Sequence, residues 1–245
     1  MRTDVAVAER AARAAADVLL RLREGELTGR PLGDAGDAAA QQAILDVLSA
    51  ERPADVVFSE EAVDDRRRLT ADRVWIVDPL DGTREYGEPG RSDWAVHVAL
   101  WTDGELAAAA VALPALDEML LTDPAHPLPA LADGPVRIAV SRTRPLAEAD
   151  AVAAALGGVL VPLGSAGYKT VAVARGEVDA YVHAGGMYQW DSAAPVAVAR
   201  AAGLTTCRLD GSPLVYNDPD PWLPDLVVCR PELAARVLAA VRSAS

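Results

Sequence analysis

Apolar residues recur with different periods along the first half of the chain. Between residues 4 and 22 they fall at three- and four-residue steps with charged residues between them, which is the period of an amphipathic helix. Farther on, short valine-rich and aromatic runs predict strands, and Asp103-Gly104 between two such runs is typical of a hairpin turn. The pattern predicts helices over 4–22 and 37–50 and strands over 55–58, 74–77, 94–101, 105–113 and 117–122. This half is therefore predicted to be an α+β layer, with helices packed on an antiparallel sheet.

A proline-rich connection separates this half from a different pattern. Residues 124–135 contain four prolines and a glycine, too many for the interior of a helix or strand. Beyond them, strand-like and helix-like segments alternate, which is typical of βαβ units. Strands are predicted over 136–141, 159–163, 178–183 and 225–229, helices over 145–156, 166–175, 191–202 and from Pro231, and a short hairpin around Asp210-Gly211. We therefore expect an α+β domain over 1–134 and an α/β domain over 135–245.

Composition and charge narrow the classes of function. The 245 residues are 51% hydrophobic, which excludes a disordered chain, and no apolar run reaches transmembrane length. The N-terminal stretch is amphipathic and lacks the apolar core of a signal peptide, so we expect a cytoplasmic protein with no membrane partner. Cys207 and Cys229 are too few for a disulfide framework. A net charge of −13 opposes the phosphate backbone, so no nucleic-acid partner is expected.

The segment after the predicted strand at 74–77 has the residues of a metal and phosphate site. Asp78-Pro79 is predicted to end this strand, because proline has no N–H to continue a ladder. Asp81 follows, so two carboxylates and a backbone carbonyl can face one space, and hard divalent cations bind such oxygen clusters. Gly82 and Thr83 come next, where a helical turn can begin and present free N–H groups to an anion. The alternative is a solvated turn, because Asp-Pro and Asp-Gly pairs also form ordinary turns.

Further carboxylates stand at the ends of two other predicted elements. Glu60 and Glu61 follow the short strand at 55–58, so a carboxylate again stands at a strand end. Asp191 stands at or near the start of the helix over 191–202. Its simpler role would be the N-cap alone, because aspartate oxygens accept hydrogen bonds from the free N–H groups of a first turn.

Three segments together resemble the inositol-monophosphatase superfamily. They are Glu60-Glu61, Trp75-Ile76-Val77-Asp78-Pro79-Leu80-Asp81-Gly82-Thr83 and Trp190-Asp191-Ser192-Ala193-Ala194. The resemblance covers nearly the whole chain and implies that family's layered αβαβα sandwich and a phosphomonoesterase that is sensitive to lithium. It implies two or three Mg²⁺ ions whose ligands are Glu60, Asp78, the Leu80 carbonyl, Asp81 and Asp191. It also implies that Thr83, paired with Asp37 or assisted by Glu60, orients a water for attack.

Residues outside the metal motif distinguish branches of this family. Asp-Gly-Thr-Arg-Glu-Tyr over 81–86 resembles the form typical of the CysQ-type branch, which hydrolyses 3′-phosphoadenosine 5′-phosphate. His183 stands where the inositol branch usually has a glutamate that accepts hydrogen bonds from the ring hydroxyls. Residues 164–169 resemble a Gly-Ser segment whose nearby lysine contacts nucleotide, although Lys169 lies one residue farther from the serine and could be an exposed helix residue. The implied substrate contacts are Gly82, Thr83, Arg84, Ser165 and Lys169.

The substrate expected on these grounds is a small phosphate ester. Removal of the 3′-phosphate from 3′-phosphoadenosine 5′-phosphate, leaving adenosine 5′-monophosphate in sulfate assimilation, is the favoured activity. Inositol-1-monophosphatase and fructose-1,6-bisphosphatase are the enzymatic alternatives, and a catalytically silent regulatory protein is the non-enzymatic one. Arg142 and Arg144 follow a predicted strand and could bind a second phosphate, because arginine forks match phosphate oxygens, or lie in a solvated loop. A monomer or a homodimer is expected.

Overall fold

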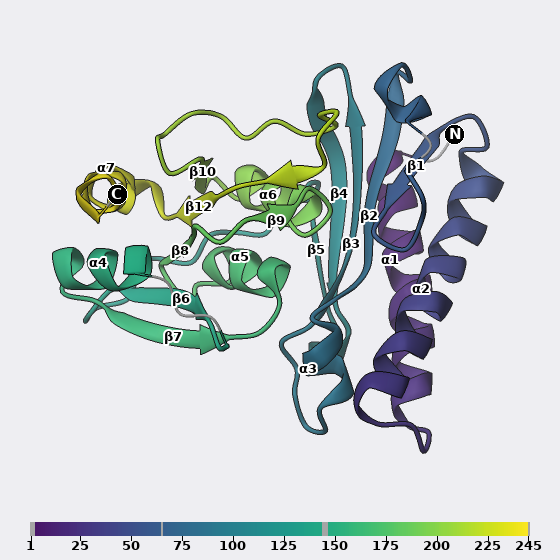
Figure 1. Cartoon of the computed structure of the whole chain (residues 1–245), viewed down its shortest axis with the longest axis horizontal. Coiled ribbons are helices and arrows are strands. Elements are labelled where there is room, and N and C mark those ends of the chain that lie inside the picture. The colour runs from purple at the N-terminus through teal and green to yellow at the C-terminus, as the bar shows by residue number, and fades with distance from the viewer. Residues whose placement is uncertain (1–2, 65, 144–146, 245) are drawn as a thin grey trace.

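The protein is built from five alternating layers of helices and strands (Figure 1). The computed structural model describes residues 3–64, 66–143 and 147–244, so Arg144 lies outside the described residues. The helices that form layers are α1 (Asp4–Arg23), α2 (Gly29–Glu51), α4 (Ala147–Leu156), α5 (Ala166–Ala174), α6 (Ala193–Ala201) and α7 (Ala234–Ala244). Helices α1 and α2 cover the outer face of a first sheet, α5 and α6 lie between the sheets, and α4 and α7 cover a second sheet. The predicted αβαβα sandwich is confirmed.

The first sheet orders its strands as they occur in the chain. They are β1 (Val56–Ser59), β2 (Arg73–Asp81), β3 (Ala95–Thr102), β4 (Glu105–Leu113) and β5 (Glu118–Leu121). Strands β2 to β5 are antiparallel, as predicted, but β1 pairs parallel to β2 with Ser59 opposite Val77. The parallel pairing was missed because it depends on how the chain returns to the sheet edge. Its consequence is that Glu60, the residue after β1, lies beside Asp78.

The second sheet is mixed and follows the order β10-β12-β8-β6-β7. Its strands are β6 (Arg137–Ser141), β7 (Val159–Leu163), β8 (Ala180–His183), β10 (Thr205–Cys207) and β12 (Leu226–Cys229). The predicted βαβ units give the parallel pairs β6–β7 and β6–β8. The predicted hairpin at Asp210-Gly211 is wrong, since the chain turns there but β10 pairs with β12. A separate two-stranded sheet joins β9 (Met187–Tyr188) to β11 (Trp222–Leu223).

Two differences between predicted and observed element boundaries shape the centre of the molecule. Strand β2 continues through Pro79 to Asp81, because the pairing with β3 is interrupted by a bulge there and the missing N–H is not needed. Helix α2 begins at Gly29, well before the predicted start. Its first turns contain Gly33 and Gly36, and a Cβ at Gly36 would lie 2.8 Å from the Tyr86 ring. Because glycines stand where a helix usually has apolar residues on its buried face, the apolar period did not reveal this first part of α2.

A buried ion pair ties the edge of the second sheet together. Asp179 is 2% exposed, and its carboxylate accepts hydrogen bonds from the backbone N–H and the guanidinium of Arg137 at 2.8–3.1 Å. Its carbonyl accepts the N–H of Arg230 at 3.1 Å, which joins β6 to the end of β12. Asp179 is therefore a structural residue. Within the described residues, no helix combines the length and the apolarity needed to cross a membrane.

Removing the Asp179 carboxylate should destabilise the fold. We expect Asp179→Ala to lower the free energy of unfolding by about 2–3 kcal/mol, because it leaves the Arg137 donors without their charged acceptor. Urea unfolding followed by circular dichroism measures this loss. Asp210→Ala, which loses one exposed hydrogen bond from the Ser212 N–H, is the control and should shift the midpoint much less. Equal midpoints for Asp179→Ala and wild type would contradict the structural role.

Candidate active site

Carboxylates from separate segments converge between the first sheet and α6. Asp78 and Asp81 lie in β2 and are 0% and 8% exposed, Glu60 follows β1, and Asp191 precedes α6. Burial raises the pKa of Asp78 well above its ordinary value, and the charges of Glu60, Asp81 and Asp191 raise it further. Burial and the charge of Asp81 also raise the pKa of Glu60 to about 7 and that of Asp191 to about 8. The four carboxylates that the sequence analysis grouped as metal ligands therefore do share one space.

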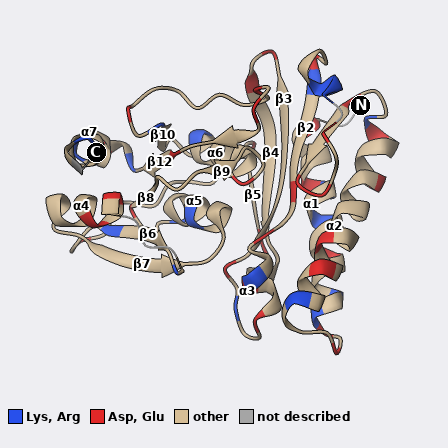
Figure 2. Cartoon of the chain, viewed as in Figure 1, with Lys and Arg blue, Asp and Glu red and all other residues tan. Residues whose placement is uncertain are grey.

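The chemistry of these residues fits a divalent metal ion. Asp78 Oδ1 accepts the N–H of Leu80 at 3.1 Å, whereas the buried Asp78 Oδ2 has no hydrogen-bond partner among the described residues. Strands β1, β3, β4 and β5 contain neither Lys nor Arg, so the sheet offers little to neutralise the carboxylates (Figure 2). Crowded carboxylate oxygens are the donors that hard divalent cations bind. Asp78, Asp81 and His97 offer ligand atoms within 4.8 Å of one another.

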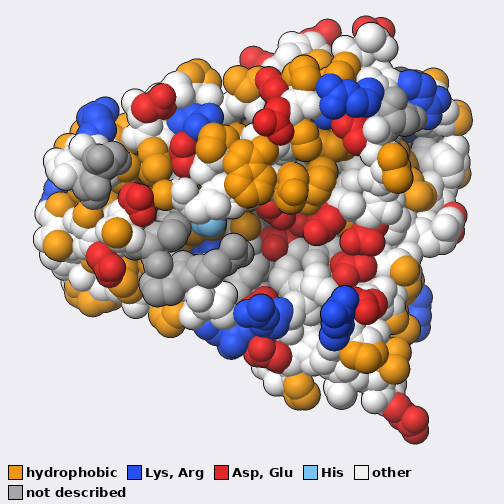
Figure 3. Space-filling view, viewed as in Figure 1, with side chains coloured by type: hydrophobic (Ala, Val, Ile, Leu, Met, Phe, Trp, Pro, Cys, Tyr) orange, Lys and Arg blue, Asp and Glu red, His pale blue; other side chains and the backbone are white. Residues whose placement is uncertain are grey.

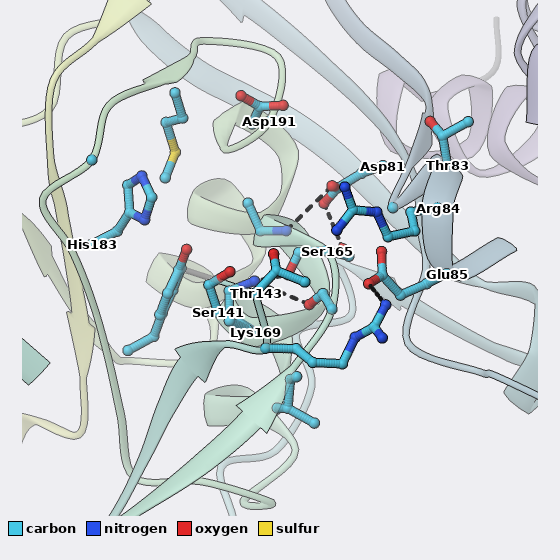
Figure 4. A pocket seen from close by; sticks show the side chains of 18 of the residues that line it. Asp81, Thr83, Arg84, Glu85, Ser141, Thr143, Ser165, Lys169, His183 and Asp191 are labelled. Carbon is cyan, nitrogen blue, oxygen red and sulfur yellow. Dashed lines mark hydrogen bonds and ion pairs between the residues drawn. The ribbon is translucent and has the colours of Figure 1, made fainter. Parts of the chain in front are cut away.

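Asp81 is held in place by the N-terminus of α5. Its Oδ2 accepts hydrogen bonds from the Ser165 hydroxyl and the Gly167 N–H, both at 2.5 Å, and its Oδ1 accepts the Ala166 N–H at 3.2 Å (Figure 4). Free N–H groups at a helix N-terminus favour a negative charge. The Ser165 hydroxyl, which was predicted to contact substrate, is thus already bonded to a carboxylate from the first sheet, although Ser165 also lines the cavity.

Thr83 and Asp37 meet on the other side of the carboxylates. Thr83 begins the short helix α3 (Thr83–Gly87), and its hydroxyl lies 3.1 Å from the carbonyl oxygen of Leu80. Burial raises the pKa of Asp37 to about 7, with contributions from the charges of Glu61 and Glu60, and a hydrogen bond from Thr83 acts in the opposite direction. Thr83 and Asp37 therefore lie close enough for the Thr83 hydroxyl to influence the pKa of Asp37.

Asp191 is not the N-cap of α6, the simpler role that its position in the sequence suggested. The N-cap position of α6 is Ser192, whose side chain makes no capping hydrogen bond. Asp191 Oδ2 instead accepts the N–H of Tyr188 at 2.6 Å, which closes a tight turn, and the charge of Asp81 is near enough to raise the pKa of Asp191; Figure 4 shows both residues at the same pocket. The turn therefore leaves Asp191 available for a site between the sheets.

A cavity of about 670 Å³ opens beside the carboxylates. Asp81, Asp191 and Arg84 line it, and the space-filling view shows acidic side chains in the hollow, hydrophobic side chains on one rim and basic ones on the other (Figure 3). Tyr188 and Trp222 also line it and are 43% and 45% exposed. The cavity therefore has one charged end and one aromatic wall.

Two basic residues around the cavity already have hydrogen-bond or ion-pair partners within the protein. Lys169 is only 5% exposed, so the alternative of an exposed helix lysine is wrong, and its Nζ donates to the carbonyls of Gly164 and Ser165 at 3.1 and 2.6 Å. Arg142 pairs with Glu85 at 2.6 Å and Glu88 at 3.0 Å. Arg142, in the segment that follows β6, thus forms ion pairs with α3 and with the residue after it.

His97 is a central residue that the sequence analysis did not select. It lies in β3 and is fully buried, with Nδ1 3.7 Å from Asp78 Oδ2 and Nε2 3.5 Å from Asp81 Oδ2. Gly167 makes room for it, since a Cβ there would lie 2.0 Å from His97 Nε2. The signal in the sequence was a lone polar residue within the apolar run 94–101, opposite Asp78 once the strands pair.

Comparison of the chain with known proteins shows the family to which it belongs. Residues 1–245 match the inositol monophosphatase family, a family of metal-dependent phosphatases. The chain is 50% identical to a 3′-phosphoadenosine 5′-phosphate phosphatase of Mycobacterium leprae, over 98% of this chain and 94% of that protein. It is 53% identical to the protein of that name from Mycobacterium tuberculosis, over 87% and 83% of the two chains. The crystal structure of CysQ from Bacteroides thetaiotaomicron superposes with a TM-score of 0.81 at 26% identity, over 93% and 97% of the chains. The chain therefore belongs to the inositol monophosphatase family.

The clustered carboxylates predict an unusual response of stability to pH. An unfolded carboxyl group titrates near pH 4, whereas Glu60 and Asp191 in the folded chain keep their protons to about pH 7 and 8. Between these values the native state binds more protons, so without divalent ions the free energy of unfolding should fall as pH rises from about 5 to about 8. Metal binding requires deprotonated carboxylates, so stabilisation by Mg²⁺ should grow over the same range.

Thermal unfolding in EDTA and in Mg²⁺ at several pH values measures both effects. Asp78→Asn removes one charge from the cluster and is expected to flatten the fall of Tm with pH in EDTA. A Tm in EDTA that does not change with pH, or a Mg²⁺ shift that is equal at low and high pH, would contradict the assignment of these carboxylates as a metal site.

Proposed function

We propose that this protein is a Mg²⁺-dependent phosphatase that removes the 3′-phosphate from 3′-phosphoadenosine 5′-phosphate and leaves adenosine 5′-monophosphate, as in sulfate assimilation. The main support for the proposal is the cavity. Asp81 and Asp191 form its charged end, where metal ions and a phosphate would bind, and Tyr188 and Trp222 form a wall on which an adenine base could stack. The names of the mycobacterial relatives support the same substrate. We propose that the protein acts in the cytoplasm, as a monomer or homodimer, with the site where domains 1–134 and 135–245 meet.

The carboxylates would hold two or three Mg²⁺ ions. Their ligands would be Glu60, Asp78, the Leu80 carbonyl, Asp81 and Asp191. Bound Mg²⁺ supplies positive charge that stabilises the ester oxygens and activates water for attack. Asp78 and Asp81 come from one strand and are fixed by its bulge and by α5, so they set the position of the site.

Thr83 and Asp37 would position a water and accept its proton. The Thr83 hydroxyl has one proton and two acceptors within reach, the Leu80 carbonyl and the Asp37 carboxylate. When it donates to Asp37, its lone pairs can accept a hydrogen bond from water and fix the direction of attack. Asp37, with a pKa of about 7, can then take up a proton at neutral pH, and Glu60 has a similar value.

The rest of the cavity suits a nucleotide better than a polyol. Tyr188 stacks on Trp190 with ring centroids 4.7 Å apart and meets Trp222 edge-on at 5.3 Å, so the aromatic wall is rigid. Bases stack on such side chains in proteins that bind nucleotides. Arg84 and Lys169 are the cavity cations suited to a second phosphate.

An inositol ring would find fewer acceptors in this cavity. His183 occupies the position expected for a ring-binding glutamate, and its Nε2 lies 2.9 Å from the carbonyl oxygen of Gly186. A ring nitrogen engaged in this way cannot accept two hydroxyl hydrogen bonds as a carboxylate does. Inositol-1-monophosphatase and fructose-1,6-bisphosphatase therefore remain the less favoured activities.

Loss of either central carboxylate should abolish turnover. We expect Asp78→Asn and Asp81→Asn to release no measurable phosphate while retaining a native circular dichroism spectrum, because each change removes charge from the metal site and not from the core. Asp72→Asn, at an exposed position just before β2, is the matched control and should keep full activity. More than about a tenth of wild-type turnover in both variants, a loss under about 1.4 kcal/mol, would refute the metal assignment.

Substrate choice should depend on the aromatic wall. We expect kcat/KM for 3′-phosphoadenosine 5′-phosphate to exceed that for inositol 1-phosphate and fructose 1,6-bisphosphate at least tenfold, with adenosine 5′-monophosphate a poor substrate. Stacking contributes roughly 1–3 kcal/mol per base, so Trp222→Ala should lower kcat/KM for the nucleotide about tenfold or more. The same variant should leave inositol 1-phosphate unaffected, and Trp222→Phe should retain the preference. Equal rates on all three esters would overturn the nucleotide assignment but not the phosphatase assignment.

A further inference from the structure

Arg68 is a buried cation that joins two segments far apart in the sequence. It lies in the short 3₁₀ helix Arg67–Leu69 between β1 and β2 and is 1% exposed. Its Nε and Nη2 donate to the Asp64 carboxylate at 2.9–3.1 Å. Its Nη1 donates to Asn217 Oδ1 at 3.0 Å and to the Asp218 carbonyl at 2.8 Å. The guanidinium therefore connects the first sheet to the long segment between β10 and β11, which runs toward the first sheet in Figure 1.

The hydrogen-bonded chain continues to the turn that carries Asp191. Asn217 donates from Nδ2 back to the Arg68 carbonyl at 3.0 Å and from its backbone N–H to Gln189 Oε1 at 2.7 Å. Gln189 is 1% exposed, and its backbone carbonyl accepts the N–H of Ala193 at 2.9 Å, in the first turn of α6. Two buried amide side chains thus lead from Arg68 to within two residues of Asp191.

A second, aromatic path leads from Arg68 to Glu60. The guanidinium carbon lies 4.1 Å from the ring centroid of Phe58, which belongs to β1 and precedes Glu60 by two residues. The Phe58 ring meets Trp190, the residue before Asp191, edge-on with centroids 5.2 Å apart. Arg68 is therefore linked to the segments that carry Glu60 and Asp191, although Arg68 itself does not line the cavity.

We propose that Arg68 is a positioning residue, which holds Glu60 and Asp191 at the spacing that a divalent cation requires. Glu60 follows β1 of the first sheet and Asp191 lies in the turn between β9 and α6, and their ionised forms carry like charges, so they tend to separate unless their segments are tied together. The planar guanidinium donates from one edge to Asp64 and from Nη1 to Asn217 and the Asp218 carbonyl, a fixed fork that the compact ammonium group of lysine does not reproduce. This inference rests on the proposed function only in taking these carboxylates as metal ligands.

Metal affinity measured apart from activity tests the proposal. Binding of Mn²⁺ to the full chain is followed by electron paramagnetic resonance, and stability by thermal unfolding in EDTA. Arg68→Gln should raise the Kd for Mn²⁺ about tenfold, because residues in one hydrogen-bond network are coupled at this scale. Arg68→Lys should raise it nearly as much. Arg73→Gln is the matched control, since the Arg73 guanidinium also donates to acceptors from two segments, the carboxylates of Asp55 and Asp4, but at the other end of β2. It should lower Tm and leave the Kd unchanged.

The outcomes separate positioning from simple stability. An unchanged Kd in Arg68→Gln with a lowered Tm, or an equal rise in Kd in Arg73→Gln, would overturn the proposal. If Arg68→Gln does not fold, Asn217→Ala removes one acceptor of the guanidinium and should raise the Kd, and no change would again overturn it. Wild-type protein that binds no Mn²⁺ would refute the metal site and the positioning role together, whereas wild-type binding with an unchanged variant Kd would refute only the latter.

Discussion

Repulsion among carboxylates buried in one space is the constraint on which the rest of the structure depends. Taken from water, Asp78 and Asp191 resist ionisation, as their raised pKa values show. The fold opposes this with hydrogen-bond donors: the N-terminus of α5 donates to both oxygens of Asp81, and the Tyr188 N–H donates to Asp191 Oδ2. Asp78 Oδ2 has no such donor among the described residues, and it is therefore the oxygen best suited to a metal ion.

The carboxylates come together only when the two sheets pack with α5 and α6 between them. Neither sheet carries the whole set, so contacts between the sheets serve the site as well as stability. Asp93 accepts the Gly164 N–H at 2.5 Å, and Arg142 reaches Glu85 on α3. Gly164 allows this approach, because a Cβ there would lie 2.3 Å from Glu85 Cγ. The contact keeps the loop before α5, and so the donors to Asp81, against the first sheet.

The residues proposed to act on the phosphate and those proposed to select the substrate lie in different parts of the cavity. The carboxylates and Thr83 come from segments whose positions are fixed by the sheets, and they would serve any phosphate ester. Tyr188 and Trp222 lie in the small sheet formed by β9 and β11, outside both large sheets. Gly186 lets this wall close, since a Cβ there would lie 1.9 Å from the Trp222 ring. The side chains of Tyr188 and Trp222 therefore face the cavity, whereas the backbone of this small sheet, through the Tyr188 N–H, holds the Asp191 carboxylate.

The sequence alone determined the features that depend on neighbouring residues. The periodicity of α1, the alternation from β6 to α6 and the carboxylates around Asp78 were all legible, because helix, strand and turn preferences are local. The parallel pairing of β1, the burial of Lys169 and the position of His97 beside two carboxylates were not. They depend on which segments meet after folding, and apolar periodicity carries no information about that. Arg68 shows the difference most clearly: in the sequence it is one of several charged residues in a loop, and only its contacts with Asn217 and Phe58, made by tertiary packing, distinguish it.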